Sequence, residues 1–151
     1  MKHINPKGFV QIPNEIMAYT VLSYSEDKAI HVTPATLGVY WALFQHRKTD
    51  PKSEMKGCTW VSQERLAVEL GTSRNTVSKH INILIRVGLI TKTKKHSGQN
   101  VFNVYRFKKP LNPEQLKKKY PSEFEAYEKA IKKIYEPESV EVVEDDDSEY
   151  I

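Results

Sequence analysis

Polar side chains able to recognise the flat edges of nucleic-acid bases recur every three or four residues between positions 74 and 86. At 100° per residue, four of them share one face of a helix: Asn75, Lys79, Asn82 and Arg86. The opposite face would carry the apolar residues Val77, Ile81 and Leu84. An asparagine amide can pair with the N6/N7 edge of adenine, and lysine or arginine with the O6/N7 edge of guanine. The spacing therefore predicts a helix that reads a DNA major groove. The simpler interpretation is that any surface helix has a polar face.

Further side chains around this helix could contact phosphates. Those at or near its start are Ser73, Arg74, Thr76 and Ser78. Three cations follow downstream at Lys92, Lys94 and Lys95, with His96 and Gln99 close to them. Lysines on a projecting hairpin can reach phosphates or the adjacent minor groove. We predict DNA contacts for the residues at the start of the helix and for the three hairpin lysines. For the lysines, the alternative is that they only keep the hairpin solvated.

The sequence lacks the usual motifs of enzymes and of metal-binding sites. The five histidines are scattered, with no pair at the spacing of a helical metal site. Cys58 is the single cysteine, so neither an intrachain disulfide nor a cysteine-rich zinc site is possible. No glycine-rich phosphate loop or Gly-x-Ser-x-Gly motif is present. We expect no catalytic residue, no metal and no cofactor, and we predict a protein that is not an enzyme, with His80 as a packed polar residue.

Capping signals place the polar helix second in a pair of helices. The N-cap serines are Ser62 for residues 63–70 and Ser73 for residues 74–87. Gly71 lies between the helices, where a left-handed backbone ends the first, and Gly88 follows the second. Ala67 is small enough for a close helix crossing, and Val77 can dock the second helix on the first. This spacing predicts a helix-turn-helix.

Two β-prone segments follow the pair, at residues 89–93 and 101–107, and they predict a two-stranded ribbon. Residues 94–100 contain the glycine and asparagine of a hairpin tip. Residues 58–61 form another short β-prone run before the first helix of the pair.

Upstream, Thr33 and Pro34 are an N-cap and first-turn pair for a helix over residues 34–46. Its apolar residues lie on several sides, which indicates a central position in the core. We expect an extended arm or strand at residues 8–13, a brief helix capped by Asn14, and a surface loop at residues 47–57.

These motifs together resemble one family of DNA-binding modules. The residues that carry the resemblance are residues 60–67, 71–77, 84–90 and 103–107. They are similar to the winged helix-turn-helix modules of bacterial, plasmid and phage DNA-binding proteins, including DnaD-like N-terminal domains and plasmid replication initiators. The resemblance covers residues 9–109 and implies an α+β, mainly helical fold with a two-stranded wing and appended C-terminal helices. It implies a sequence-specific protein for double-stranded DNA, either a transcriptional regulator of plasmid or phage type or a replication initiation or primosome accessory protein. A winged domain that serves protein contacts is a third class.

Charge is strongly segregated along the 151 residues, although the net charge is only +4. Residues 60–109 carry ten lysines and arginines against Glu64 and Glu69, whereas residues 136–151 carry eight acids and no base. Clustered cations gain free energy by releasing counterions from nucleic acid, so this pattern favours a polyanion partner. The N-terminus lacks the apolar run of a secretory signal, and the longest weakly charged stretch is too polar to span a bilayer. We expect a cytoplasmic protein.

The sequence divides into a DNA-binding domain at residues 1–109, a helical extension at residues 110–135 and an acidic disordered tail at residues 136–151. Asn112 and Pro113 begin a short helix, and a capping box of Ser122 and Glu125 predicts a second. An amphipathic stripe on the second helix needs a surface to cover: it comprises Phe124, Tyr127, Ile131 and Ile134. We favour a homodimer over packing within the chain. The tail could bind a protein partner or the basic face, or simply keep the protein soluble.

Overall fold

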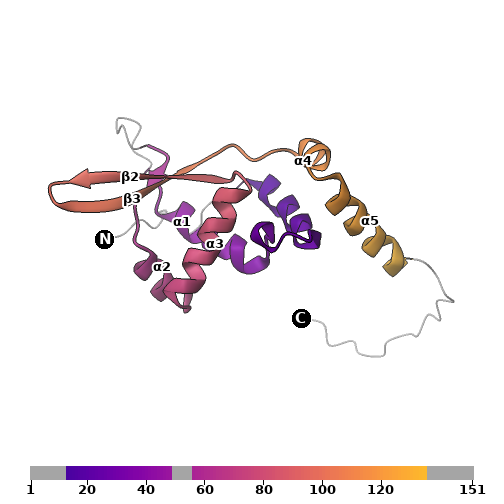
Figure 1. Cartoon of the computed structure of the whole chain (residues 1–151), viewed down its shortest axis with the longest axis horizontal. Coiled ribbons are helices and arrows are strands. Elements are labelled where there is room, and N and C mark those ends of the chain that lie inside the picture. The colour runs from indigo at the N-terminus through magenta and orange to yellow at the C-terminus, as the bar shows by residue number, and fades with distance from the viewer. Residues whose placement is uncertain (1–12, 49–55, 136–151) are drawn as a thin grey trace, which may run out of the picture.

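The computed structural model describes residues 13–48 and 56–135 (Figure 1). Its elements, in chain order, are the 3₁₀ helices η1 (Asn14–Tyr24) and η2 (Lys28–Ile30), then α1 (Pro34–Gln45), β1 (Cys58–Thr59), α2 (Gln63–Leu70), α3 (Arg74–Arg86), β2 (Ile90–Ser97), β3 (Asn100–Phe107), α4 (Pro113–Lys119) and α5 (Pro121–Tyr135). Helices dominate, and the strands form one small sheet.

The helix-turn-helix consists of α2 and α3, and its boundaries follow from local side-chain chemistry. Ser62 Oγ accepts from the Arg65 N–H at 3.1 Å, and Ser73 Oγ accepts from the Thr76 N–H at 3.2 Å. Gly71 has φ +65°, a left-handed conformation that a β-carbon disfavours. The predicted caps and turn are confirmed.

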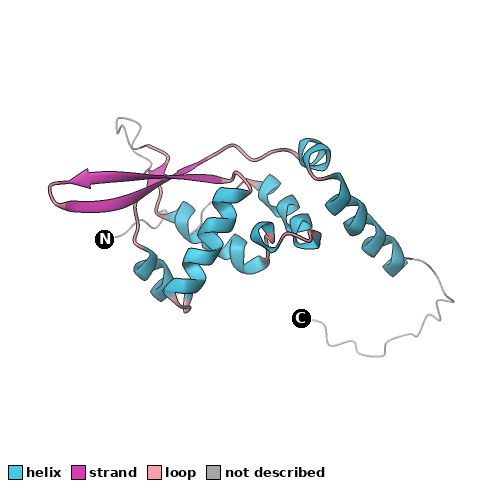
Figure 2. Ribbon diagram, viewed as in Figure 1, coloured by secondary structure: helices cyan, strands magenta, loops and turns pink. Residues whose placement is uncertain are grey.

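The sheet has three antiparallel strands in the order β1-β3-β2. Its β2–β3 hairpin confirms the predicted ribbon, and Figure 2 shows this hairpin extending away from the helices. The tip predicted at residues 94–100 is too long, because β2 continues to Ser97 and β3 begins at Asn100. Gly98, with φ +62°, allows a two-residue turn, and backbone pairing then extends through polar residues whose side chains remain in solvent. The short strand β1 pairs with β3, a contact that the sequence did not indicate.

The core surrounds α1, as its apolar sides predicted. Val39, Tyr40 and Leu43 are buried there, and α1 packs against both α2 and α3. Tyr40 stacks on Phe44 with ring centroids 5.8 Å apart. Phe107, at the end of β3, meets both rings edge-on, which attaches the base of the wing to the helical core.

The N-terminal segment contributes more to this core than the brief helix that was expected. η1 spans 11 residues, and it buries Ile16, Tyr19 and Leu22. The Tyr19 hydroxyl accepts from the Leu111 N–H at 2.9 Å, which ties η1 to the segment after the wing. Of the arm predicted at residues 8–13, only Pro13 lies within the described residues. Positions 49–55 of the predicted surface loop also lie outside them.

The helical extension packs back onto its own chain. α4 has the predicted capping box, formed by Asn112 and Gln115. α5 packs against η1, where Phe124 is buried and Tyr127 meets Tyr24 edge-on at 6.1 Å. In the part of the chain that the structure describes, no helix is long and apolar enough to cross a membrane. The acidic tail lies outside this part.

The capping box predicted for Ser122 and Glu125 is wrong. α5 begins at Pro121, one residue before Ser122, and Ser122 Oγ donates to Glu123 Oε1 at 3.2 Å. The fixed φ of proline suits a first helical position, so the helix begins before the serine can cap it. With this correction the architecture is an α+β, mainly helical winged helix-turn-helix.

Candidate nucleic-acid interface

The exposed face of α3 carries the four side chains predicted to read bases. Asn75, Lys79, Asn82 and Arg86 are all exposed, whereas Val77, Ile81 and Leu84 are buried against the rest of the domain. The two sets therefore occupy opposite faces, as the 100° rotation per residue predicted. Donors and acceptors of the exposed set point outward from a rigid helix, which is the arrangement that major-groove reading requires.

The short hydroxyl side chains at the start of α3 are mainly occupied with the helix itself. Ser73 Oγ caps the helix and lies 2.9 Å from Thr76 Oγ1, so the two hydroxyls share a hydrogen bond. Thr76 and Ser78 are half-buried. Ser73 thus has a structural task, and any phosphate contact that it makes would be secondary to capping.

Arg74, in the first turn of α3, pairs with Glu64 of α2 at 3.2 Å. Both side chains are more than half exposed, and an ion pair in such a setting contributes about 0–1 kcal/mol. Glu64 is one of only two acids in the basic segment. Arg74 can therefore exchange this partner for a phosphate at little cost.

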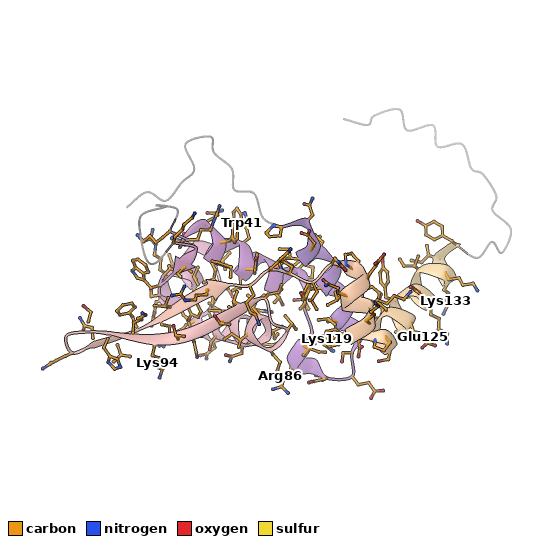
Figure 3. All side chains as sticks on the ribbon, turned by 90° about the horizontal axis from the view of Figure 1, so that it is seen from above. Trp41, Arg86, Lys94, Lys119, Glu125 and Lys133 are labelled. Carbon is orange, nitrogen blue, oxygen red and sulfur yellow. The ribbon has the colours of Figure 1, made fainter. Side chains whose placement is uncertain are left out.

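The strand register separates the wing lysines into two sets. Side chains alternate between the faces of a strand, so Lys92 and Lys94 share one face of β2 and Lys95 lies on the other. Lys92 is paired with Tyr105, and Lys94 with Asn103. Figure 3 shows Lys94 and Arg86 projecting from the same side of the molecule, opposite to Trp41. Lys92 and Lys94 can thus act together with the exposed face of α3, and Lys95 points away from that set.

A hydrogen bond that the sequence did not indicate joins the wing to the helix-turn-helix. Gln63 Nε2, at the start of α2, donates to the hydroxyl of Tyr105 at 3.2 Å. Tyr105 is fully buried two residues before the end of β3. This contact fixes the angle between the wing and the helices, and only the folded chain brings the two residues together.

Two histidines hold the helices in place from inside the domain. His46 Nε2, at the end of α1, lies 2.7 Å from Glu69 Oε1 of α2. His80, on the buried side of α3, places Nδ1 2.9 Å from Thr36 Oγ1 of α1. Burial, and to a lesser extent the charge of Lys79, lowers the pKa of His80. His80 is therefore a neutral, packed polar residue near pH 7, in agreement with the sequence prediction.

Comparison with known proteins gives the class of this domain. Residues 31–90 match a family model described as a helix-turn-helix domain. The match runs from just before α1 to the first residue of β2, which is less than half of the chain, and it agrees with the helix-turn-helix fold of α2 and α3. No curated protein matches the chain. Among solved structures, a possible transcriptional regulator from Methanosarcina mazei Go1 is similar, with 15% sequence identity, coverage of 78% of this chain and 87% of that chain, and a TM-score of 0.41.

Proposed function

We propose that this protein binds double-stranded DNA, with α3 in the major groove and the wing on the neighbouring phosphates. The observation that carries the proposal is the outward face of α3, where amide and cationic side chains lie opposite the buried docking residues. The charge pattern supports it, because residues 72–110 contain no acid. The protein would act by binding alone, without catalysis.

The wing provides the first test. Neutralising a lysine that contacts phosphate should weaken binding to all duplexes alike and reduce the log–log salt slope by about 0.9. We expect this result for Lys94→Gln and a smaller effect for Lys95→Gln, because the two side chains lie on opposite faces of β2. Fluorescence anisotropy with labelled duplex, at several salt concentrations, measures both quantities. A flat salt dependence of the wild type would instead support a winged domain that serves protein contacts.

Within this function, we favour a sequence-specific transcriptional regulator of plasmid or phage type. The helix-turn-helix match supports only the DNA-binding class, and the plasmid or phage type rests on the motif resemblance. Selection of bound sequences from a random DNA pool tests for a defined operator. Preference for an origin-like array of repeats, or binding to replication proteins, would favour the alternative role in replication initiation or primosome assembly. The predicted contact of the acidic tail with a protein partner would be compatible with either role.

We further propose a homodimer joined through the C-terminal half of α5. The first half of this helix already covers η1, but Ile134 and Tyr135 near its end are 74% and 78% exposed. Ile131, one turn before Tyr135, is partly exposed and extends the same apolar stripe. A second copy would bury this stripe, and two linked domains could recognise two half-sites.

Ile134→Glu is expected to convert the dimer into a monomer, because it places a charge in an apolar contact without touching the core. Sedimentation equilibrium measures the mass, and circular dichroism reports whether the fold is kept. Lys132→Gln, an exposed neighbour with the same change in charge, is the matched control and should remain dimeric. A wild type that is monomeric at all concentrations would contradict the dimer.

A further inference from the structure

A hollow of about 450 Å³ lies beside α3, on the side formed by η2 and the beginning of α1. Its lining includes Lys28, His31, Thr33, Lys79 and His80. A neighbouring hollow of about 520 Å³ shares Lys28 and Lys79 and continues along α3 to Asn82 and Arg86. No carboxylate lines either hollow in the part of the chain that the structure describes. The two hollows thus form one basic groove along the helix.

The polar groups at this hollow are donors without an acidic partner. Neither Lys28 nor Lys79 forms an ion pair with a described carboxylate. The nearest acid in sequence, Asp27, accepts from the Ala29 N–H at 2.9 Å at the start of η2. His31 Nε2 is bonded to the Ser25 carbonyl at 2.5 Å. Two ammonium groups therefore remain available for an anion, and for Lys79 this contact would replace the base contact predicted from the sequence.

His80 is the most informative of the lining residues. It is only 7% exposed, and its Nδ1 is bonded to Thr36. Thr36 Oγ1 accepts from the Thr33 N–H at 3.1 Å and lies 3.2 Å from the Thr33 hydroxyl, so Thr36 donates to Nδ1 when the Thr33 hydroxyl donates to Thr36. In that arrangement the proton of the neutral ring lies on Nε2, and the one hydrogen bond described for the ring is made by Nδ1. No side-chain nitrogen of the described residues is both buried and without a partner, so this N–H reaches the surface, where it can donate to a ligand oxygen.

The beginning of α1 adds a fixed positive field to the same place. Ala35, in its first turn, lines the hollow, and Pro34 before it has no N–H. The Ala35 N–H and the dipole of this 12-residue helix favour an anion at its N-terminus, although Thr36 belongs to the capping box and the Leu37 N–H is bonded to Thr33. Together with Lys28, Lys79 and His80, they provide the mixture of charge and directed hydrogen bonds that phosphate oxygens prefer.

We propose that this hollow is a phosphate pocket, and that it holds a backbone phosphate of DNA on the side of α3 remote from the wing. The second part of this inference rests on the proposed function. If α3 occupies a major groove, phosphate strands flank it on both sides, and Lys92 and Lys94 are placed for one of them. The basic groove from Lys28 to Arg86 follows the other side of the helix. The two sides together would clamp the duplex around α3.

Inorganic phosphate tests the pocket without DNA. In the full-length wild-type protein, NMR should show a saturable shift of the His80 ring and of the Ala35 amide as phosphate is added. Lys28→Gln, at an exposed position that does not threaten the fold, should abolish the response. Lys118→Gln, an exposed lysine on α4, should leave it intact. Absence of a saturable response in the wild type would overturn the pocket.

Duplex binding by the same variants tests the source of the phosphate. Lys28→Gln is expected to weaken preferred and random duplexes alike by several-fold and to reduce the salt slope by about 1, whereas Lys118→Gln should change neither. A lost phosphate response with unchanged duplex affinity would overturn the assignment to DNA and point to a free phosphorylated ligand. Phosphate binding by a wild type that fails to bind duplex would reject the proposed function and leave the pocket standing.

Discussion

Replacing Asn75 by alanine is expected to reduce affinity for the preferred duplex by roughly 1–3 kcal/mol, with little loss on random DNA. Asn75 is the second residue of α3 and is exposed in the first turn, the part of a recognition helix that reaches base edges. The amide offers a donor and an acceptor side by side, and alanine retains the helix but neither group. Anisotropy titrations on the selected and random duplexes give the two affinities.

The same substitution at Asn82 is the positional control for this prediction. Asn82 lies two turns further along the same exposed face and lines the basic groove together with Lys28. We expect a smaller loss there, because the end of a recognition helix leaves the groove. Equal losses on selected and random DNA for Asn75→Ala would make it a phosphate contact. No loss on either DNA would place the interface elsewhere on the domain.

Leu66→Ala is expected to lower the free energy of unfolding by about 2–5 kcal/mol. Leu66 is fully buried in α2, where this helix packs on α1 and α3, and alanine would leave a cavity. Duplex binding should weaken as the folded fraction falls. Urea denaturation followed by circular dichroism measures the stability.

Val68→Ala, in the same helix, separates this packing effect from the effect of losing an apolar side chain. Val68 is 81% exposed, and alanine has the higher helix propensity, so stability should stay within about 0.5 kcal/mol of the wild type. A similar loss for both variants would mean that α2 is not held by the packing described above.

The features that could be predicted from the sequence are those determined over a few residues. Ser62, Ser73 and Gly71 act on backbone groups within four positions, and the faces of α3 follow from the helical period alone. The alternation of a strand likewise separates Lys94 from Lys95 once the hairpin is located. The extent of that hairpin was misjudged, because the pairing of polar residues depends on the backbone of the partner strand. The capping box of Ser122 was also wrong, because α5 begins at Pro121.

Contacts between distant positions could not be predicted in this way. The bond between Gln63 and Tyr105 joins residues 42 positions apart, and that between Thr36 and His80 joins residues 44 apart. The basic groove also needs η2 and α1 to meet α3, and η2 is too short to leave a periodic pattern. Neither composition nor spacing carries information about such tertiary neighbours.

The position of β2 at the margin of the sheet has a consequence for solubility. No strand among residues 13–48 and 56–135 lies beside its outer backbone N–H and C=O groups, and such an edge invites the addition of strands from other molecules. Lysines are among the residues that oppose this kind of aggregation, and Lys92, Lys94 and Lys95 all lie on this edge. The same charges would thus attract DNA and keep copies of the protein apart. A form that is unable to bind DNA is better made with glutamate than with apolar residues at these positions, since glutamate repels phosphate and still protects the edge.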